Sequence, residues 1–246
     1  MRIDGARALV TGASSGIGAE TAVLLAKRGV TVLAVGRDTT ALTALTDRTG
    51  GRCLAADLAE PDAAARVAEW AGAVDLLVGN AGVGFAGDLN EMPADRLHQV
   101  IAVNLTAHLA LTRLLLPPMR KARRGHLVFV TSIAGRMGVA DEAVYSASKA
   151  GLSTFADAIR LAHAPDGIGV SVVVPGVVDT KFFDRRGRPY DRRSPRPVPA
   201  AKVAAALVAA VEHNRPEVFV PAWLRFPARL NGLAPALVAK LQRKFG

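Results

Sequence analysis

Tyr145 and Lys149 are four residues apart, and Ser132 ends an apolar run thirteen residues before the tyrosine. Positions i and i+4 of a helix share one face, so the phenol and the ammonium can point into one pocket. A cation held beside a tyrosine favours the phenolate and draws its pKa down from about 10 toward neutrality. A serine hydroxyl at a neighbouring strand end could then hold a carbonyl or alcohol oxygen. The alternative for such a Tyr–Lys pair is a solvated helix face.

The elements that would position these side chains follow a regular alternation. The predicted strands are residues 6–11, 30–36, 51–56, 74–79, 125–131, 168–174 and 216–220, and the predicted helices are 16–28, 39–48, 62–71, 93–121, 143–163 and 199–214. Uninterrupted apolar strands separated by helices predict a parallel sheet that is covered on both faces. We therefore expect a single α/β domain over residues 1–221, with a doubly wound parallel sheet (a Rossmann fold) of about seven strands.

Residues 181–199 depart from this alternation. They are too rich in Pro, Gly and Arg for a stable element. Ligands of a doubly wound sheet bind beyond the carboxyl ends of its strands, and this segment follows the sixth predicted strand. We therefore predict that it forms a lid over a binding crevice.

A glycine-rich loop joins the first predicted strand to a helix. Glycines permit a tight turn, and the helix N-terminus offers free N–H groups to a pyrophosphate. The residues of this loop are Gly12, Ser14, Ser15, Gly16, Ile17 and Gly18. The alternative is a generic strand-to-helix turn, but this strand–loop–helix context is the one that dinucleotide binding requires. We predict a dinucleotide cofactor.

Arg37 follows the second predicted strand, where the ribose of the adenosine would lie. A carboxylate there repels a 2′-phosphate, whereas a guanidinium pairs with it bidentately. The sequence therefore predicts NADP(H) in preference to NAD(H). Asp38 offsets part of the gain, and the alternative is a solvated arginine at a strand end.

Together these motifs resemble the short-chain dehydrogenase/reductase family, in its shorter single-domain branch, over about residues 5–220. The family's glycine motif matches from Thr11 to Gly18. The resemblance adds further cofactor contacts at Asp57 and Leu58, at Asn80, Ala81 and Gly82, and at Pro175, Gly176, Val178 and Thr180. One departure is Gly79, which stands where the family has a first asparagine before Asn80.

The same resemblance implies a reversible hydride transfer between NADP(H) and a carbonyl/alcohol pair. A lipid-like or acyl-carrier substrate is one candidate for this pair. Its catalytic set matches Asn104, Ser132, Tyr145 and Lys149. Tyr145 would exchange the proton, Ser132 would hold the same oxygen, and Lys149 would hold the nicotinamide ribose and lower the pKa of Tyr145. Asn104 would help to place a water beside Lys149. Relatives usually form dimers or tetramers through the helices near 93–121 and 143–163, which implies a homo-oligomer. The alternative is a non-catalytic, cofactor-sensing protein on this fold, which would have no need of the Ser–Tyr–Lys set.

The chain carries no pattern typical of a metal site or of export. Its histidines are His98, His108, His126, His163 and His213, and none clusters with Cys53 or with carboxylates at ligand spacing. We predict no catalytic metal, and we place His108 and His126 at the surface or the edge of the core. No apolar signal core precedes the first strand, and no uninterrupted apolar run reaches the ~18–20 residues of a spanning helix. We expect a cytoplasmic protein.

The net charge of +10 lies in the last quarter of the chain. Residues 1–180 hold 17 Lys+Arg and 17 Asp+Glu, whereas residues 181–246 hold 14 and 4. One explanation is a solvated surface with an ordinary lid. A second is an anionic carrier, such as coenzyme A or an acyl carrier protein. The lid arginines for that role are Arg185, Arg186, Arg188, Arg192, Arg193 and Arg196.

A third explanation is an anionic membrane surface that binds the C-terminal tail, residues 222–246. Apolar residues at helical intervals (Phe226, Leu230, Leu233, Leu237, Leu241) lie among basic ones (Arg225, Arg229, Lys240, Arg243, Lys244). We expect Pro227 and Pro235 to break the tail into short pieces, so the stripe could equally pack on its own domain or on a partner subunit. The segment has no nucleic-acid reading motif, and we predict no nucleic-acid partner.

Overall fold

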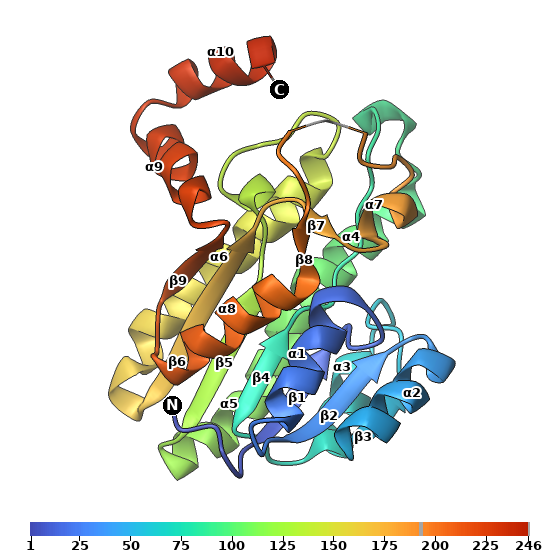
Figure 1. Ribbon diagram of the computed structural model, residues 1–246, viewed down its shortest axis with the longest axis vertical. Coiled ribbons are helices and arrows are strands. Elements are labelled where there is room, and N and C mark those ends of the chain that lie inside the picture. Colours follow the sequence, from blue (N-terminus) through green and yellow to red (C-terminus); the bar gives the residue numbers. More distant parts are fainter. Residues whose placement is uncertain (192–193, 246) are drawn as a thin grey trace.

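A seven-stranded parallel sheet forms the centre of the protein (Figure 1). The computed structural model describes residues 1–191 and 194–245. The strands are β1 (Arg7–Thr11), β2 (Thr31–Gly36), β3 (Arg52–Ala55), β4 (Leu76–Gly79), β5 (Gly125–Val130), β6 (Ile168–Pro175) and β9 (Glu217–Val220), in the spatial order β3-β2-β1-β4-β5-β6-β9. Each begins and ends within two residues of the predicted strand.

Both faces of the sheet are buried because its strands consist mainly of apolar residues. In β1, Leu9 packs into the core on one face, and Ala8 and Val10 pack into the core on the other. Successive strand side chains point to opposite faces, so this continuous apolar run supplies two cores at once.

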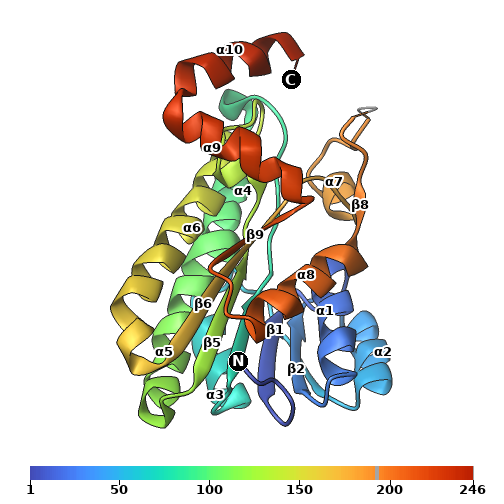
Figure 2. The same cartoon turned by 60° about the vertical axis from the view of Figure 1, so that its left-hand side comes forward.

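Helices cover each face (Figures 1 and 2). One face is covered by α1 (Gly16–Ala26), α2 (Thr39–Thr49) and α8 (Ala200–Glu212), and the other by α3 (Ala63–Ala71), α5 (Ala107–Ala122) and α6 (Ala143–His163). The predicted doubly wound fold, with about seven strands, is confirmed. The order of the strands reverses at β1, which pairs with β2 on one side and with β4 on the other. A ligand crevice is expected at the carboxyl ends of β1 and β4.

The predicted helix 93–121 consists of three parts. α4 (Ala94–Ile101) leads into a π-helical turn, Ala102–Thr106, and then into α5. In that turn the N–H of Ala107 donates to the carbonyl of Ala102, five residues earlier. The whole stretch Ala94–Ala122 is long and apolar enough to cross a membrane, but half of its most apolar window is buried in this domain. It is therefore explained as a core helix.

The lid carries more structure than the sequence suggests, so the prediction of no stable element in residues 181–199 is wrong. It contains a one-turn helix, α7 (Phe182–Arg185), and β8 (Val198–Pro199), which pairs with β7 (Val178–Asp179) just before the lid. The helix exists because tertiary contacts hold its aromatic and basic side chains, as described below. Arg192 and Arg193 lie outside the described residues.

The C-terminal tail consists of a 3₁₀ turn (Ala222–Leu224), α9 (Arg225–Leu233) and α10 (Pro235–Phe245). Pro227 does not break the tail, because it lies in the first turn of α9, where its missing N–H has no helical partner to lose. Pro235 is the first residue of α10, a favourable position for proline. The helical path of the tail is interrupted only at Ala234, between α9 and α10.

The two loops that border the crevice are joined by the hydroxyl of Thr11. Its Oγ1 donates to the carbonyl oxygen of Val78 at 3.2 Å and accepts the N–H groups of Asn80 at 2.9 Å and Ala81 at 3.0 Å. The side-chain amide of Asn80 donates back to the carbonyl oxygens of Thr11 and Gly12. The ends of β1 and β4 are thereby held at a fixed separation.

Thr11→Val should lower the free energy of unfolding by about 1–3 kcal/mol, because the N–H groups of Asn80 and Ala81 would lose their acceptor in a partly or fully buried place. Urea unfolding measures the loss. The matched control is Thr131→Val, since Thr131 is buried at a strand end but its hydroxyl only donates, to Val173 at 3.2 Å. Equal losses in the two variants would contradict the special role of Thr11.

Candidate active site

A cavity of about 1630 Å³ lies beyond the carboxyl ends of the strands. It brings together all of the predicted site residues except Gly18 and Asn104. From the cofactor set it is lined by Gly12, Ser14, Ser15, Gly16, Ile17, Arg37, Asp57, Leu58, Asn80, Ala81, Gly82, Pro175, Gly176, Val178 and Thr180, and from the catalytic set by Ser132, Tyr145 and Lys149. Gly18 and Asn104 lie behind this lining and support it.

The glycine loop fits a dinucleotide pyrophosphate. Gly12 and Gly16 have positive φ angles of 64° and 55°, and a Cβ on Gly12 would lie 2.9 Å from the Cα of Ala81. A Cβ on Gly18 would lie 2.3 Å from the carbonyl oxygen of Gly12, so this glycine lets α1 approach the loop. Ser15 precedes α1, and among the described residues its side chain does not cap the helix. The N-terminal N–H groups of α1 are thus available to an anion in the cavity.

Arg37 and Asp57 meet at the adenosine end of the cavity. The guanidinium of Arg37 lies 3.4 Å from the carboxylate of Asp57, and the two side chains are 53% and 32% exposed. Asp38 caps α2 by accepting the N–H of Ala41 at 3.0 Å. The carboxylate of Asp38 therefore has a hydrogen-bonding partner of its own at the start of α2.

The loop after β4 is clamped from the π-helical turn. The amide of Asn104 accepts the N–H of Val83 at 2.8 Å and donates to the Val83 carbonyl at 2.9 Å. It also donates to the hydroxyl of Ser148 at 3.0 Å, and Ser148 donates in turn to the carbonyl of Tyr145. Asn104 is fully buried. Its side chain therefore couples the cofactor loop to the helix that carries Tyr145 and Lys149.

His108 supports the same loop one turn further along. Its Nε2 lies 2.9 Å from the carbonyl oxygen of Ala81, which makes Nε2 the donor, and its Nδ1 has no partner among the described residues. Burial, with a smaller contribution from the charge of Lys149, lowers the pKa of His108 to about 4. The prediction that His108 and His126 lie at the surface or the core edge is wrong, since both are buried. Each faces a hydrogen-bonding group inside the fold, which for His126 is the hydroxyl of Ser171.

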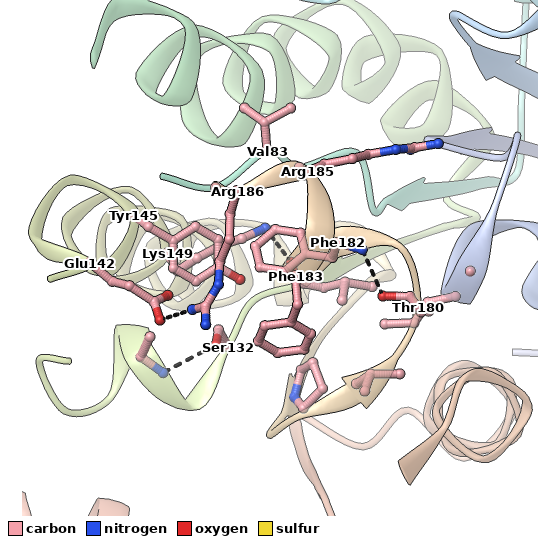
Figure 3. A pocket seen from close by; sticks show the side chains of 18 of the residues that line it. Val83, Ser132, Glu142, Tyr145, Lys149, Thr180, Phe182, Phe183, Arg185 and Arg186 are labelled. Carbon is pink, nitrogen blue, oxygen red and sulfur yellow. Dashed lines mark hydrogen bonds and ion pairs between the residues drawn. The ribbon is translucent and has the colours of Figure 1, made fainter. Parts of the chain in front are cut away.

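Tyr145 is buried and lies beside Ser132 on the wall of the cavity (Figure 3). Burial raises the pKa of Tyr145 well above its ordinary value, and a hydrogen bond to Ser132 opposes this rise. The charge of Glu142 adds to the rise, and the charge of Arg186 lowers the pKa. The structure therefore keeps the phenol protonated.

Lys149 points past the tyrosine ring toward the end of β5. Its Nζ donates to the carbonyl of Val130 at 2.9 Å and lies 5.9 Å from the centroid of the Tyr145 ring. Burial lowers the pKa of Lys149 to about 8. The effect of Lys149 on the pKa of Tyr145 stays a prediction, and Arg186 is a second cation that lowers this pKa.

The lid packs directly on Tyr145 (Figure 3). The ring of Phe182 lies 5.3 Å from the ring of Tyr145, and Arg186 lies over the ring of Phe183 at 4.6 Å. Arg186 also forms an ion pair with Glu142, and both side chains are largely buried. These contacts hold α7 against the N-terminus of α6.

Sequence reasoning missed Phe182, Glu142 and Arg186 as parts of the site. The Phe–Phe pair inside a basic segment was the available signal for Phe182, whereas nothing in the sequence indicates that Glu142 pairs with the lid. Arg186 and Arg188 were assigned to an anionic carrier, but Arg186 pairs with Glu142, and Arg188 pairs with Asp141 at 2.9 Å. Within residues 1–191 and 194–245, no group of three or more His, Cys, Asp or Glu side chains could hold a metal ion.

Comparison with known proteins agrees with this geometry. A family model described as short chain dehydrogenase matches residues 6–191. A ketoacyl reductase, HetN, from Nostoc sp. is 32% identical over 99% of this chain and 90% of its own. A short-chain dehydrogenase from Sphingobium yanoikuyae in complex with NADPH superposes with a TM-score of 0.84 at 28% identity, covering 96% of this chain and 95% of its own. A relative from Burkholderia phymatum in complex with NAD has the same TM-score at 25% identity, covering 96% of each chain.

The fold and the matched motifs define an oxidoreductase that acts on CH–OH groups with NAD(P). The chain belongs to the short-chain dehydrogenase/reductase family. This leaves the hypothesis of a non-catalytic, cofactor-sensing protein without support.

Lys149→Met should stabilise the cofactor-free protein at pH 7. The pKa of Lys149 is about 8 when folded and 10.5 for the ordinary group, so in this interval the unfolded chain binds a proton that the folded chain lacks. The free energy of unfolding of the wild type therefore rises with pH from about 8 to 10.5, by up to about 3 kcal/mol in this contribution.

The variant should be more stable than the wild type by about 2–3 kcal/mol at pH 7. This advantage should shrink as the pH rises, as measured by chemical unfolding between pH 7 and about pH 10. Lys202→Met, on the exposed surface of α8, is the control and should track the wild type. A Lys149→Met advantage that stays constant with pH would contradict the assignment of the effect to a buried charge.

Proposed function

We propose that this protein interconverts a carbonyl and an alcohol with NADP(H), with Tyr145 as the general acid/base. One observation carries the proposal: Tyr145 is buried and lines the same cavity as Ser132, Lys149 and the glycine loop. The cofactor, when bound, supplies or accepts the hydride. The side chains of this protein bind and orient the substrate and exchange the proton.

Tyr145 and Ser132 would act on one substrate oxygen. In the reducing direction the Tyr145 hydroxyl donates its proton to that oxygen, while Ser132 hydrogen-bonds to it and stabilises the developing negative charge. Because burial holds the pKa of Tyr145 high, the free enzyme carries this proton at neutral pH. In this state Tyr145 can donate the proton that carbonyl reduction requires.

Lys149 and Asn104 would act on the cofactor side. Lys149 is within reach of Gly82, since a Cβ on that glycine would lie 3.2 Å from Nζ, and it would bind the nicotinamide ribose there. Asn104 holds Val83 and, through Ser148, the backbone of Tyr145. It is thus a positioning residue by its side chain, and by its backbone it would help to place the water beside Lys149.

The lid suggests a substrate with an apolar portion. Phe182, Phe183 and Tyr190 form a chain of ring contacts with Tyr145, and Met137 lines the cavity with them. An acyl chain or another lipid-like group suits such a wall. The similarity to a ketoacyl reductase supports an acyl substrate, carried by an anionic carrier or free.

NADP(H) is the proposed cofactor in preference to NAD(H). Arg37 is half-exposed at the adenosine end of the cavity, and its partner Asp57 lies at the long distance of 3.4 Å. A 2′-phosphate offers a stronger, bidentate partner. Structural relatives bind either cofactor, so the preference rests on Arg37.

We also propose a homo-oligomer that uses the helices near 93–121 and 143–163. The support for it is membership of a family whose members commonly form oligomers. A cytoplasmic location stays a prediction.

Tyr145→Phe should lower the turnover of carbonyl substrates by at least about 10³-fold, because the variant has no proton to donate. Binding of NADPH should be retained. A panel of ketones, β-ketoacyl esters and aldehydes, followed by the loss of NADPH absorbance, identifies the substrate with the wild type and then measures the variant. Tyr190→Phe is the matched control, since the hydroxyl of Tyr190 donates to the carbonyl of Pro195 in the lid. Near wild-type activity of Tyr145→Phe would refute the role.

Arg37→Ala should lower kcat/KM with NADPH by about 10- to 150-fold, the equivalent of one charge-assisted contact with a phosphate. The value with NADH should change little. Steady-state kinetics with both cofactors measures the ratio, and Arg48→Ala on the exposed surface of α2 is the control. An unchanged NADPH/NADH ratio in Arg37→Ala would overturn the preference.

A further inference from the structure

The exposed apolar side chains of this protein are concentrated on the C-terminal tail. Among the described residues, seven large hydrophobic side chains are exposed, and five of them are Trp223, Phe226, Leu233, Leu237 and Leu241. Phe226 and Leu233, on α9, are 74% and 85% exposed. A concentration of this kind marks an interaction surface, whereas single exposed side chains scattered over a protein do not.

The tail is held in place by its opposite face. Leu224 and Val238 are buried, and the side-chain amide of Asn231 donates to the carbonyl of Arg136 at 3.1 Å. These contacts decide which face of α9 and α10 points inward. Phe226 and Leu233, seven residues apart on α9, and Leu237 and Leu241, four residues apart on α10, are left uncovered and together make up the apolar stripe of the tail.

The charges around this face have one sign. No acidic residue follows Glu217, whereas five basic residues do, among them Arg225, Arg229 and Lys240. These three side chains are exposed, and none of them forms an ion pair with any part of the chain that the structure describes. Cations without an intramolecular partner beside an apolar stripe match an anionic surface that has an apolar interior.

We propose that α9 and α10 dock on an anionic lipid membrane. The apolar stripe enters the boundary between headgroups and acyl chains, Arg225, Arg229 and Lys240 contact the phosphates, and Trp223 lies at the headgroup level. A second copy of the chain is a poorer occupant, because a two-fold contact between these faces would bring cations against cations with no acidic residue of the tail to neutralise them.

The position of the tail gives the docking a use. α9 and α10 extend from the end of β9 beyond the sheet, on the same side of the protein as the lid (Figures 1 and 2). Ala239 of α10 lines the cavity that contains Tyr145. Docking would therefore bring the cavity mouth to the membrane, so that an apolar substrate enters from the bilayer; this last step rests on the proposed function, but the docking does not.

The test is flotation of the full-length protein with vesicles of phosphatidylcholine, alone or mixed with phosphatidylglycerol. The wild type should bind the anionic vesicles and not the neutral ones, and salt should weaken the binding. Leu233→Ser/Leu237→Ser should weaken it at least about tenfold. Arg225→Gln/Arg229→Gln should weaken it about 30-fold, equivalent to two basic contacts.

Leu161→Ser is the matched control, because Leu161 is nearly as exposed as Leu233 (81% against 85%) but lies near the far end of α6. It should bind as the wild type does, and all variants should keep the wild-type thermal midpoint. Failure of the wild type to float with anionic vesicles would overturn the proposal. So would a loss of oligomeric state in Leu233→Ser/Leu237→Ser with unchanged flotation, since the stripe would then be a subunit interface.

Flotation needs neither substrate nor turnover, and it separates this proposal from the proposed function. Tyr145→Phe should float as the wild type does while losing carbonyl reduction. If the wild type floats but reduces no carbonyl substrate, only the proposed chemistry is contradicted. If it is active but does not float, only the docking is contradicted.

Discussion

The hydroxyl of Thr11 joins the two loops between which the order of the strands reverses. It accepts two backbone N–H groups from the loop after β4 and donates to the carbonyl oxygen of Val78, near the end of that strand. The amide of Asn80 adds two bonds in the opposite direction, to Thr11 and Gly12. The loops are so close that no side chain fits at Gly12. A cleft of this width is therefore built before any ligand arrives, which reduces the ordering that binding must impose.

Asn104 connects the loop after β4 to the helix that carries the reactive groups. Its amide binds the backbone of Val83 on one side and Ser148 on the other, and Ser148 binds the backbone of Tyr145. The cofactor loop and α6 thus belong to one hydrogen-bonded unit. The same arrangement buries Tyr145 and Lys149, and the lowered pKa of the lysine shows that its charge is held at a cost to stability. Sites that use titratable groups often carry such a cost.

The sequence predicts the sheet well because β1, β4, β5 and β6 consist mainly of apolar residues, and this pattern is local. The glycine loop and the Tyr145–Lys149 spacing are equally local, so both can be recognised in the sequence. In the structure both lie on the wall of one cavity. The features that escaped depend on partners distant in the chain. α7 is stabilised by contacts with Glu142 and Tyr145, some forty residues earlier. His108 can be buried because its ring forms a hydrogen bond with the carbonyl oxygen of Ala81. The effect of Arg186 on Tyr145 required the folded position of the lid.

The π-helical turn sets a rotational phase. A bond that spans five residues accommodates one residue more than a regular turn, and each residue of an α-helix advances the chain by about 100° around the axis. Removing one residue from Ala102–Thr106 would restore a regular helix but would turn α5 by that angle relative to α4. His108 and Leu111 would then leave the loop and the core that they contact. Small deletions in this family member are therefore least tolerable in a stretch that, by composition, looks like ordinary helix.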